Sequence, residues 1–397
     1  NLVVSQMKKK QSHYIQLDLI LFVLIFAVVS LLAIYNAQQL GQYPDNFVLK
    51  QVNYYLIAIG LLVGLQFFDL DQIYKSSFYI YLIGVFSLII LHFSPHSIAR
   101  PVNNAKSWFN GSMFPLTIQP AEFMKIALIL FLAMLIVKHK QKYETSNLNT
   151  DLWLIAKILI ATIVPVLFIV QQPDLGTSVI FLFIAGMLII LSGVDWKILT
   201  VIIVGGSASL VLVILFIVNF PDLAQTVLGI KPYQIDRILT WFDPTQQVED
   251  DRFHIDRSLL TIGSGQLTGK GMGNPQVALP EAHTDFIFAI IGESFGFIGS
   301  ATVMFLFFLL IYKLVTLGMK TYEYNPFGAY ICFGYMAFVL IHTFQNIGMT
   351  IGIMPITGIP LLFISYGGST ILSTMIGYAF VYRVAIEHSR HEELLFK

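Results

Sequence analysis

Residues 17–36 read LDLILFVLIFAVVSLLAIYN, an almost unbroken apolar run in which Asp18 is the only charged residue. An α-helix of about 20 apolar residues is long enough to cross the hydrocarbon core of a bilayer. Runs of this kind recur along the 397-residue chain, which is 56% hydrophobic and only 12% charged. This composition excludes an ordinary soluble domain and predicts an all-α polytopic membrane protein.

About ten candidate transmembrane helices follow one another, and a long polar loop, residues 220–283, separates the seventh from the eighth. The predicted spans are approximately 17–36, 51–68, 76–93, 120–137, 152–171, 175–192, 196–219, 284–312, 326–348 and 357–385. We expect a single transmembrane domain over residues 1–397. We interpret residues 1–6, which precede Met7, as additions to the natural chain.

The distribution of lysine and arginine predicts the orientation. An even number of spans places both termini on one side of the membrane, and that side collects most of the positive charge. Its residues are Lys8, Lys9, Lys10, Lys75, Lys138, Lys140, Lys142, Lys197, Lys313, Lys320, Arg383, Arg390 and Lys397, whereas the opposite short loops carry Lys50, Arg100 and Lys106. We therefore expect cytoplasmic termini and an extracellular 220–283 loop.

Other classes of protein are excluded by charge and cysteine content. The net charge is zero, so nothing indicates a nucleic-acid partner. The single cysteine, Cys332, excludes a disulfide framework and a cysteine-based metal site.

Glu122 and Lys125 lie near the outer end of the fourth predicted span, in the sequence QPAEFMK. Residues three apart share one face of a helix. The two charges can form an ion pair that makes both tolerable at the membrane edge, or line a wet cavity that faces a charged substrate, and the two interpretations are compatible. Asp174, between the fifth and sixth spans, is predicted to be a turn residue or the N-cap of the next helix.

The end of the long loop gathers three titratable residues, Glu281, His283 and Asp285, where the chain re-enters the membrane. A carboxylate at that place is costly to keep, which favours a functional site. The alternative is a helix N-cap stabilised by the helix dipole. The preceding segment, residues 262–273, is too rich in glycine for a stable helix interior, and its N–H groups could contact phosphate.

Several motifs in this order resemble the SEDS (shape, elongation, division and sporulation) family, over nearly the whole chain. The matching segments are NAKSW (104–108), QPAEFMK (119–125), QPDLGT (172–177), YQIDR (233–237), FDP (242–244), IGSG (262–265), GKG (269–271), LPEAHTDFIFA (279–289), PITGIP (355–360) and ISYGGS (364–369). The short N-terminus and the segments 231–244 and 363–369 resemble RodA more than FtsW.

The resemblance implies a peptidoglycan glycosyltransferase of the bacterial plasma membrane, which polymerises lipid II into glycan strands during cell elongation and maintenance of cell shape. It also implies a class B penicillin-binding protein as partner. Asp285 would be the general base. The expected substrate-binding residues are Lys106, Glu122, Lys125, Arg237, Glu281 and His283. The sequence requires no cofactor, although a divalent cation, Mg²⁺ or Mn²⁺, could assist through Glu122 or Asp285.

Two other functions compete with this one. A lipid II flippase would explain polar residues within helices but not an elaborate outer loop that ends in a carboxylate. The paired broken helices of many transporters, built from internal repeats, are not evident in the sequence. A scaffold for a penicillin-binding protein would predict that the charged residues at the membrane edge can be neutralised without loss of function.

Overall fold

The computed structural model describes residues 15–101, 105–110, 117–143, 147–172, 174–228, 235, 239 and 249–395. Its helices are α2 (Leu17–Gln38), α3 (Phe47–Leu65), α4 (Leu70–Phe93), α5 (Pro120–Lys142), α6 (Leu148–Gln171), α7 (Leu175–Leu191), α8 (Trp196–Asn219), α9 (Pro221–Leu228), α11 (Glu249–Ser264), α12 (Ile287–Thr321), α13 (Pro326–Thr350) and α14 (Gly368–Leu395). In this part of the chain nine helices are long and apolar enough to cross a membrane, and α7 is a shorter apolar helix. Together they confirm the predicted all-α polytopic fold.

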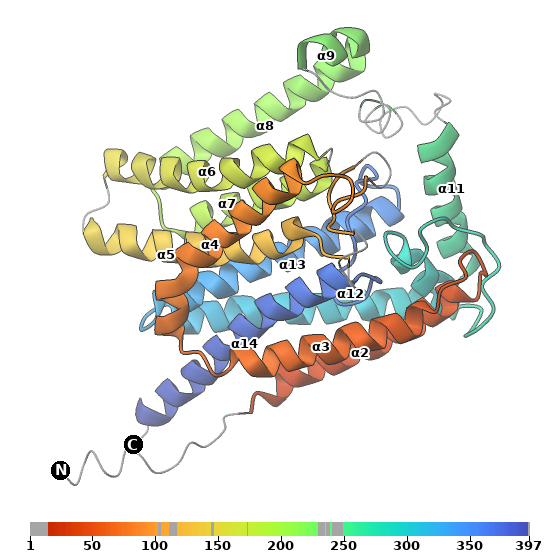
Figure 1. Ribbon diagram of the computed structural model, residues 1–397, viewed down its shortest axis with the longest axis horizontal. Helices are drawn as coiled ribbons and strands as arrows, with labels where there is room; N and C mark the ends of the chain where they lie inside the picture. The colour runs from red at the N-terminus through yellow and green to blue at the C-terminus, as the bar shows by residue number, and fades with distance from the viewer. Residues whose placement is uncertain are drawn as a thin grey trace.

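The membrane-spanning helices run side by side, and the two ends of the bundle differ (Figure 1). We call the end at which α2 begins and α14 ends the terminal end, on the left in Figure 1, and the opposite end, which carries α11, the loop end.

The starts of two helices follow from local chemistry. The side chain of Asn46 accepts a hydrogen bond from Leu49 N at the start of α3, and Pro120 occupies the first turn of α5, where its missing N–H costs nothing.

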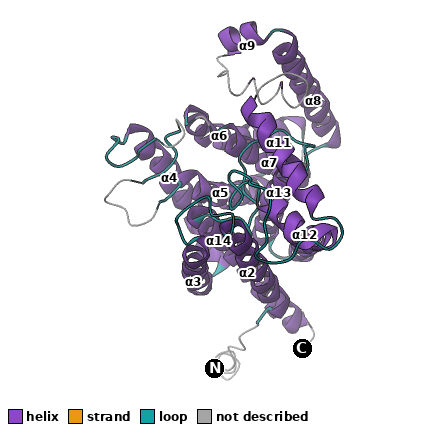
Figure 2. Ribbon diagram, turned by 90° about the vertical axis from the view of Figure 1, so that its right-hand side faces the viewer, coloured by secondary structure: helices purple, strands orange, loops and turns teal. Residues whose placement is uncertain are grey.

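Helices α5, α13 and α14 form the centre of the bundle, as the view onto the loop end shows (Figure 2). About four fifths of their most apolar windows is buried, 78%, 83% and 78% respectively, against 17% for α3 and 22% for α4. The outer helices α3 and α4 are therefore largely left to face lipid, while the central ones face protein. Polar side chains on α5 and α13 are therefore enclosed by other helices.

Helix α8 stands apart from this bundle together with α9 (Figures 1 and 2). Only 6% of its apolar window is buried, so nearly its whole surface is left for contact with lipid.

The glycine-rich segment packs against α12. Lys270 N donates to Glu293 O at 2.9 Å and Gly271 N donates to Ser294 O at 3.0 Å, while the ammonium of Lys270 lies 2.7 Å from Glu293 Oε1. A side chain at Gly269 would collide with the backbone of Ser294, which explains the need for glycine. These two N–H groups are already bonded, so the interpretation that they contact phosphate is wrong for them.

The tenth predicted span begins eleven residues too early, because α14 starts at Gly368 and not at residue 357. Residues 355–367 form turns and irregular backbone instead. Two prolines, Pro355 and Pro360, and the left-handed conformation of Gly358 (φ +67°) prevent a continuous helix here. This non-helical segment lies within the bundle at the loop end, where it forms one wall of the site described next.

Candidate active site

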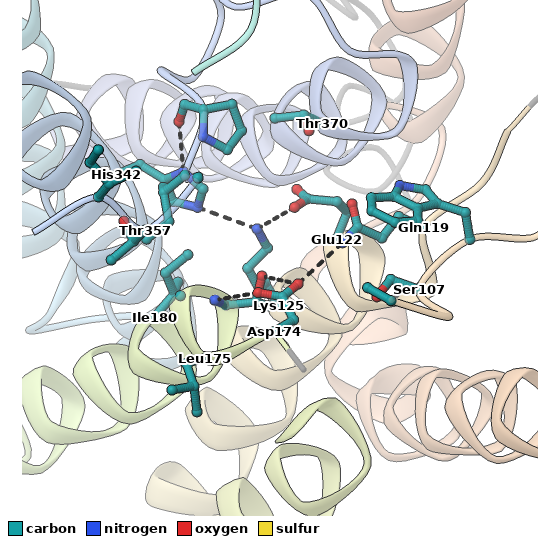
Figure 3. A pocket seen from close by; sticks show the side chains of 18 of the residues that line it. Ser107, Gln119, Glu122, Lys125, Asp174, Leu175, Ile180, His342, Thr357 and Thr370 are labelled. Carbon is teal, nitrogen blue, oxygen red and sulfur yellow. Dashed lines mark hydrogen bonds and ion pairs between the residues drawn. The ribbon is translucent and has the colours of Figure 1, made fainter. Parts of the chain in front are cut away.

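A cavity of about 380 Å³ lies at the loop end between α5, α7, α13 and the segment 355–360. Four of the side chains that line it are titratable: Glu122, Lys125, Asp174 and His342. Figure 3 shows them pointing toward one another from three parts of the chain. Polar groups that converge in an otherwise apolar bundle are typical of a site for a polar or charged ligand.

Lys125 is at the centre of this network. Its ammonium lies 2.7 Å from Glu122 Oε1 and 3.3 Å from His342 Nε2 (Figure 3). The Lys125 residue is 0% exposed and Glu122 is 3% exposed, so the ion pair is sealed from bulk water. A buried pair is stable only when its remaining polar atoms also have partners, and Ser373 Oγ supplies one to Glu122 Oε2 at 3.3 Å. The predicted pairing of Glu122 with Lys125 is confirmed.

His342 has a tautomer fixed by its surroundings. Its Nδ1 lies 3.0 Å from the carbonyl oxygen of Pro360. A carbonyl oxygen only accepts, so Nδ1 carries the proton, and in the neutral ring Nε2 accepts a hydrogen bond from Lys125. A chain of hydrogen bonds thus runs from the backbone at Pro360 through His342 and Lys125 to Glu122, and it fixes the position of the ammonium in the cavity wall.

Asp174 is the N-cap of α7, as predicted, and it also lines the cavity. Its carboxylate accepts from Thr177 N at 3.0 Å and from Thr177 Oγ1 at 2.8 Å, and Gln119 Nε2 donates to it at 3.4 Å. Burial raises the pKa of Asp174, although the bonds from Thr177 and the charge of Lys125 act in the opposite direction. Asp174 is therefore a second carboxyl group in the cavity besides Glu122. Its burial disfavours the ionised form of Asp174.

Asp285 lies next to the cavity wall, in the turn of residues 281–286 that leads into α12. Asn346 Nδ2 donates to the carbonyl oxygens of Asp285, at 2.7 Å, and Ile359, at 2.8 Å, and so ties this turn to the cavity wall. A Cβ atom at Gly358 would come within 3.3 Å of Asp285 Oδ2. The carboxylate of Asp285 therefore lies beside the backbone of a residue that lines the cavity, although Asp285 is not itself part of the lining.

His283 is not among the residues that line the cavity, and its ring lies among aromatic side chains. Its ring stacks on Phe47 at a centroid distance of 4.1 Å, and its carbonyl oxygen accepts from Tyr366 N at 2.9 Å. Burial lowers the pKa of His283, and the charge of Glu281 opposes this shift. Glu281 is exposed and accepts a hydrogen bond from Thr284 Oγ1 at 3.1 Å. His283 thus anchors the turn, while Glu281 is open to solvent.

The ammonium of Lys106, a cation of the predicted site, is bound outside the network in the cavity. Lys106 donates to the carbonyl oxygens of His92, at 3.0 Å, and Ser94, and so binds the carbonyl groups at the end of α4. In this arrangement its ammonium is directed at the helix end, although the neighbouring Ala105 and Ser107 line the cavity. Arg237 lies outside the described residues, and its role stays a prediction.

His342 and Asn346 are site residues that the sequence analysis missed. They are four residues apart in α13, so they lie on one face of that helix, and both face the segment that follows it. A pair of polar residues at this spacing inside an apolar span is a signal that reasoning from the sequence could have used. The spacing alone could not have identified the partners of these two residues, because His342 and its partner Lys125 are 217 residues apart in the sequence.

A model of the family described as "Cell cycle protein" (FTSW_RODA_SPOVE) matches residues 10–390. The chain belongs to this family. Members of the FtsW/RodA/SpoVE family have related sequences over most of the chain. A probable peptidoglycan glycosyltransferase FtsW of Wigglesworthia glossinidia brevipalpis is 30% identical over 96% of both chains. Stage V sporulation protein E of Bacillus subtilis is 29% identical over 89% of this chain and 92% of its own.

Solved structures share this fold. A chain from a structure described as "Structural coordination of polymerization and crosslinking by a peptidoglycan synthase complex" matches with a TM-score of 0.74 and 24% identity, over 94% of this chain and 98% of its own. Thermus thermophilus rod shape determining protein RodA matches with a TM-score of 0.65 and 22% identity, with the same coverage. The helical bundle therefore has the same overall fold as these structures.

Proposed function

We propose that this protein is a peptidoglycan glycosyltransferase that polymerises lipid II into glycan strands. The observation that carries the proposal is the arrangement at the loop end, where the carboxylate of Asp285 borders a cavity that contains the buried Glu122–Lys125–His342 network. A glycosyl transfer from a lipid pyrophosphate needs a base at the membrane surface and a fixed cation near the leaving group. The names of the curated relatives, FtsW peptidoglycan glycosyltransferases among them, support the same activity.

In the proposed reaction, the 4-hydroxyl oxygen of the acceptor sugar bonds to the anomeric carbon of the donor while the bond from that carbon to the pyrophosphate breaks. The hydroxyl proton passes to the carboxylate of Asp285, and undecaprenyl pyrophosphate leaves as an anion. General-base assistance of this kind typically contributes about 10²- to 10⁴-fold in rate.

Lys125 is the described cation best placed to stabilise the leaving pyrophosphate. It is held by Glu122 and His342 in the cavity wall, and in a site shielded from water a fixed charge acts more strongly than in solvent. Arg237 is proposed as a second cation, with a planar guanidinium suited to two phosphate oxygens. Glu281, exposed on the turn next to Asp285, is proposed to contact the sugars.

Assistance by a divalent cation through Glu122 or Asp285 stays a prediction. Both carboxylate oxygens of Glu122 have partners, Lys125 and Ser373, and no group of three or more His, Cys, Asp or Glu side chains in the described ranges is placed to hold a metal ion. No step of the proposed reaction therefore uses one. Assays with and without Mg²⁺ or Mn²⁺ test the predicted assistance.

We place the terminal end in the cytoplasm and the loop end outside the bacterial plasma membrane, because lysine and arginine gather at the terminal end. Lipid II would then bind with its sugars outside and its lipid tail between helices. A class B penicillin-binding protein, which cross-links glycan strands, is the proposed partner. The fold shared with a chain of a peptidoglycan synthase complex, in which polymerization and crosslinking are coordinated, supports an assembly of this kind.

For the cellular role we propose a RodA-type function in elongation and cell shape, rather than the FtsW role in division. The support is the sequence of segments 231–244 and 363–369. Expression in bacteria depleted of one or the other protein tests this. Restoration of rod shape supports the RodA role, and restoration of septation alone would contradict it.

One assay separates the enzyme from the flippase and the scaffold. Purified protein is incubated with labelled lipid II, with and without a class B penicillin-binding protein, and glycan strands are resolved by gel electrophoresis. In parallel, translocation of lipid II is measured in liposomes. The enzyme predicts strands, the flippase predicts translocation without strands, and the scaffold predicts neither. Absence of strands in the presence of the partner would contradict the proposed function.

A further inference from the structure

A second charged hollow lies at the terminal end, on the opposite side of the membrane from the active-site cavity. It has a volume of about 640 Å³ and lies between α4, α5 and α6. Its positively charged or protonatable lining residues, which we call the basic groove, are Lys75, Lys138, His139, Lys142 and Lys157. They come from three different helices.

The basic groove concentrates charge of one sign. Lys138 and Lys142 are four residues apart in α5 and lie on the same face, where like charges repel each other. Lys157 is fixed at the groove by contacts to His139, Nζ to Nδ1 at 3.2 Å, and to the ring of Trp153 at 5.2 Å. No carboxylate lines the groove, and within the described ranges none of its four lysines forms an ion pair.

Two aspartates lie close in sequence to the groove. Asp71 precedes Lys75 by one turn of α4 and is exposed, and Asp151 lies in the first turn of α6. One carboxylate oxygen of Asp151 already accepts a hydrogen bond from Asp195 N at 3.0 Å. Neither aspartate is among the described residues that line the groove, although the charge of Asp151 acts on the neighbouring His139.

The rest of the groove is apolar and extends toward the membrane interior. Phe78, Phe131, Met134 and Leu135 line it together with the lysines. From Phe131 to Lys142 the groove follows α5 for about 16 Å, at 1.5 Å per residue. Positive charge at this end is expected from topology alone. Topology does not require a hollow whose charged end continues into an apolar floor.

We propose that the basic groove binds an anionic phospholipid of the surrounding bilayer, with the phosphate headgroup among the lysines and an acyl chain along Phe78, Phe131 and Met134. Basic pockets between membrane helices have the chemistry to hold such headgroups. The positive charge of the lysines favours an anionic lipid over a zwitterionic one. The apolar lining residues favour a lipid, which has an acyl chain to place there, over soluble phosphate. The site is separate from the proposed glycosyltransferase site, and its occupancy can be measured without any assay of glycan synthesis.

The test is native mass spectrometry of the purified full-length chain in detergent, with phosphatidylglycerol and phosphatidylcholine of identical acyl chains. We expect preferential binding of phosphatidylglycerol at low ionic strength. In the triple variant Lys75→Gln, Lys138→Gln and Lys142→Gln, we expect an apparent affinity on the order of 100-fold weaker, since each lysine near a membrane surface contributes about 1 kcal/mol. Crosslinking with a diazirine-bearing phosphatidylglycerol should label peptides of α4, α5 and α6.

A matched control removes the same charge from the same end outside the groove, through Lys197→Gln, Lys313→Gln and Lys320→Gln. An equal loss of binding in the control would overturn the proposal, as would equal binding of the two lipids by the unaltered chain. Displacement of the lipid by millimolar inorganic pyrophosphate would also overturn it, by showing that the groove binds soluble phosphate. If the triple variant does not fold, the single variant Lys75→Glu replaces it. This substitution reverses one charge of the basic groove at an exposed position.

Discussion

Helix α5 carries charged residues at both of its ends, and the two sets are built differently. At the loop end, Lys125 is buried between Glu122 and His342. Its ammonium contacts one atom of each, Glu122 Oε1 and His342 Nε2. At the terminal end, Lys138 and Lys142 are exposed and have no carboxylate partner among the described residues. The first arrangement fixes one ammonium in place, whereas the second makes a broad positive surface. A buried, neutralised network suits positioning for chemistry, and an open surface of one sign suits attraction of an anion.

The largest effect that this comparison predicts is on stability. Lys125→Ala leaves the carboxylate of Glu122 buried without its cation, which should lower the free energy of unfolding by about 3–5 kcal/mol. Lys138→Ala, on the same helix but exposed, should change it by no more than about 0.5 kcal/mol. Denaturant unfolding in mixed micelles measures both. Similar losses in the two variants would mean that the ends of α5 do not differ as described.

A double variant separates the structural from the chemical role of the pair. Glu122→Gln with Lys125→Met removes both charges at nearly constant volume, so most of the stability should return. Glycan synthesis should not return, because the proposed cation for the pyrophosphate is gone. Recovery of synthesis together with stability would make the pair purely structural.

An intermediate effect is expected at His342, which positions the ammonium of Lys125 in the cavity wall. His342→Ala removes one of the two polar partners of the ammonium and should lower kcat about tenfold, or about 1.4 kcal/mol. The KM for lipid II should change less than kcat. His342→Gln offers an amide that can both donate and accept, and should restore part of the rate. A fall in folded yield with an unchanged kcat would mean that His342 contributes to packing and does not position Lys125 for the reaction.

The smallest effect concerns pH and the turn that holds Asp285. Burial lowers the pKa of His283 below its usual 6.5, so between the folded and unfolded pKa values the unfolded chain binds more protons. The stability contributed by the neutral ring is therefore complete above about pH 6.5 and is lost as the pH falls through the lower, folded-state pKa. His283→Phe keeps the stack on Phe47 without titration and should flatten the dependence of the unfolding midpoint on pH. His96→Phe, at an exposed loop position, is the control and should leave the dependence unchanged.

The sequence predicted what depends on local periodicity. Long apolar runs identified the spans, the three-residue spacing of Glu122 and Lys125 predicted their ion pair, and the position of Asp174 after a proline predicted an N-cap. Each of these features is set by residues within one turn of helix of each other.

Features that depend on contacts between distant segments were beyond this reasoning. The partner of Lys125 is His342, on another helix, and the apolar segment before Gly368 is not helical because of its prolines and Gly358. The charge of the terminal end was used for orientation only, since nothing in the sequence shows that α4, α5 and α6 form a groove there. Lys106 was expected to bind the substrate, and only the structure shows its ammonium at the end of α4.

The account depends most on the carboxylate next to the wall of the loop-end cavity. The direct measurement is glycan synthesis from labelled lipid II by purified Asp285→Asn, with Asp45→Asn as a control that removes an outer carboxylate paired with Lys50 away from the cavity. The account predicts a rate at least about 100-fold lower for Asp285→Asn at unchanged folded yield, and an unchanged rate for Asp45→Asn. Synthesis by Asp285→Asn at the rate of the unaltered protein would contradict it.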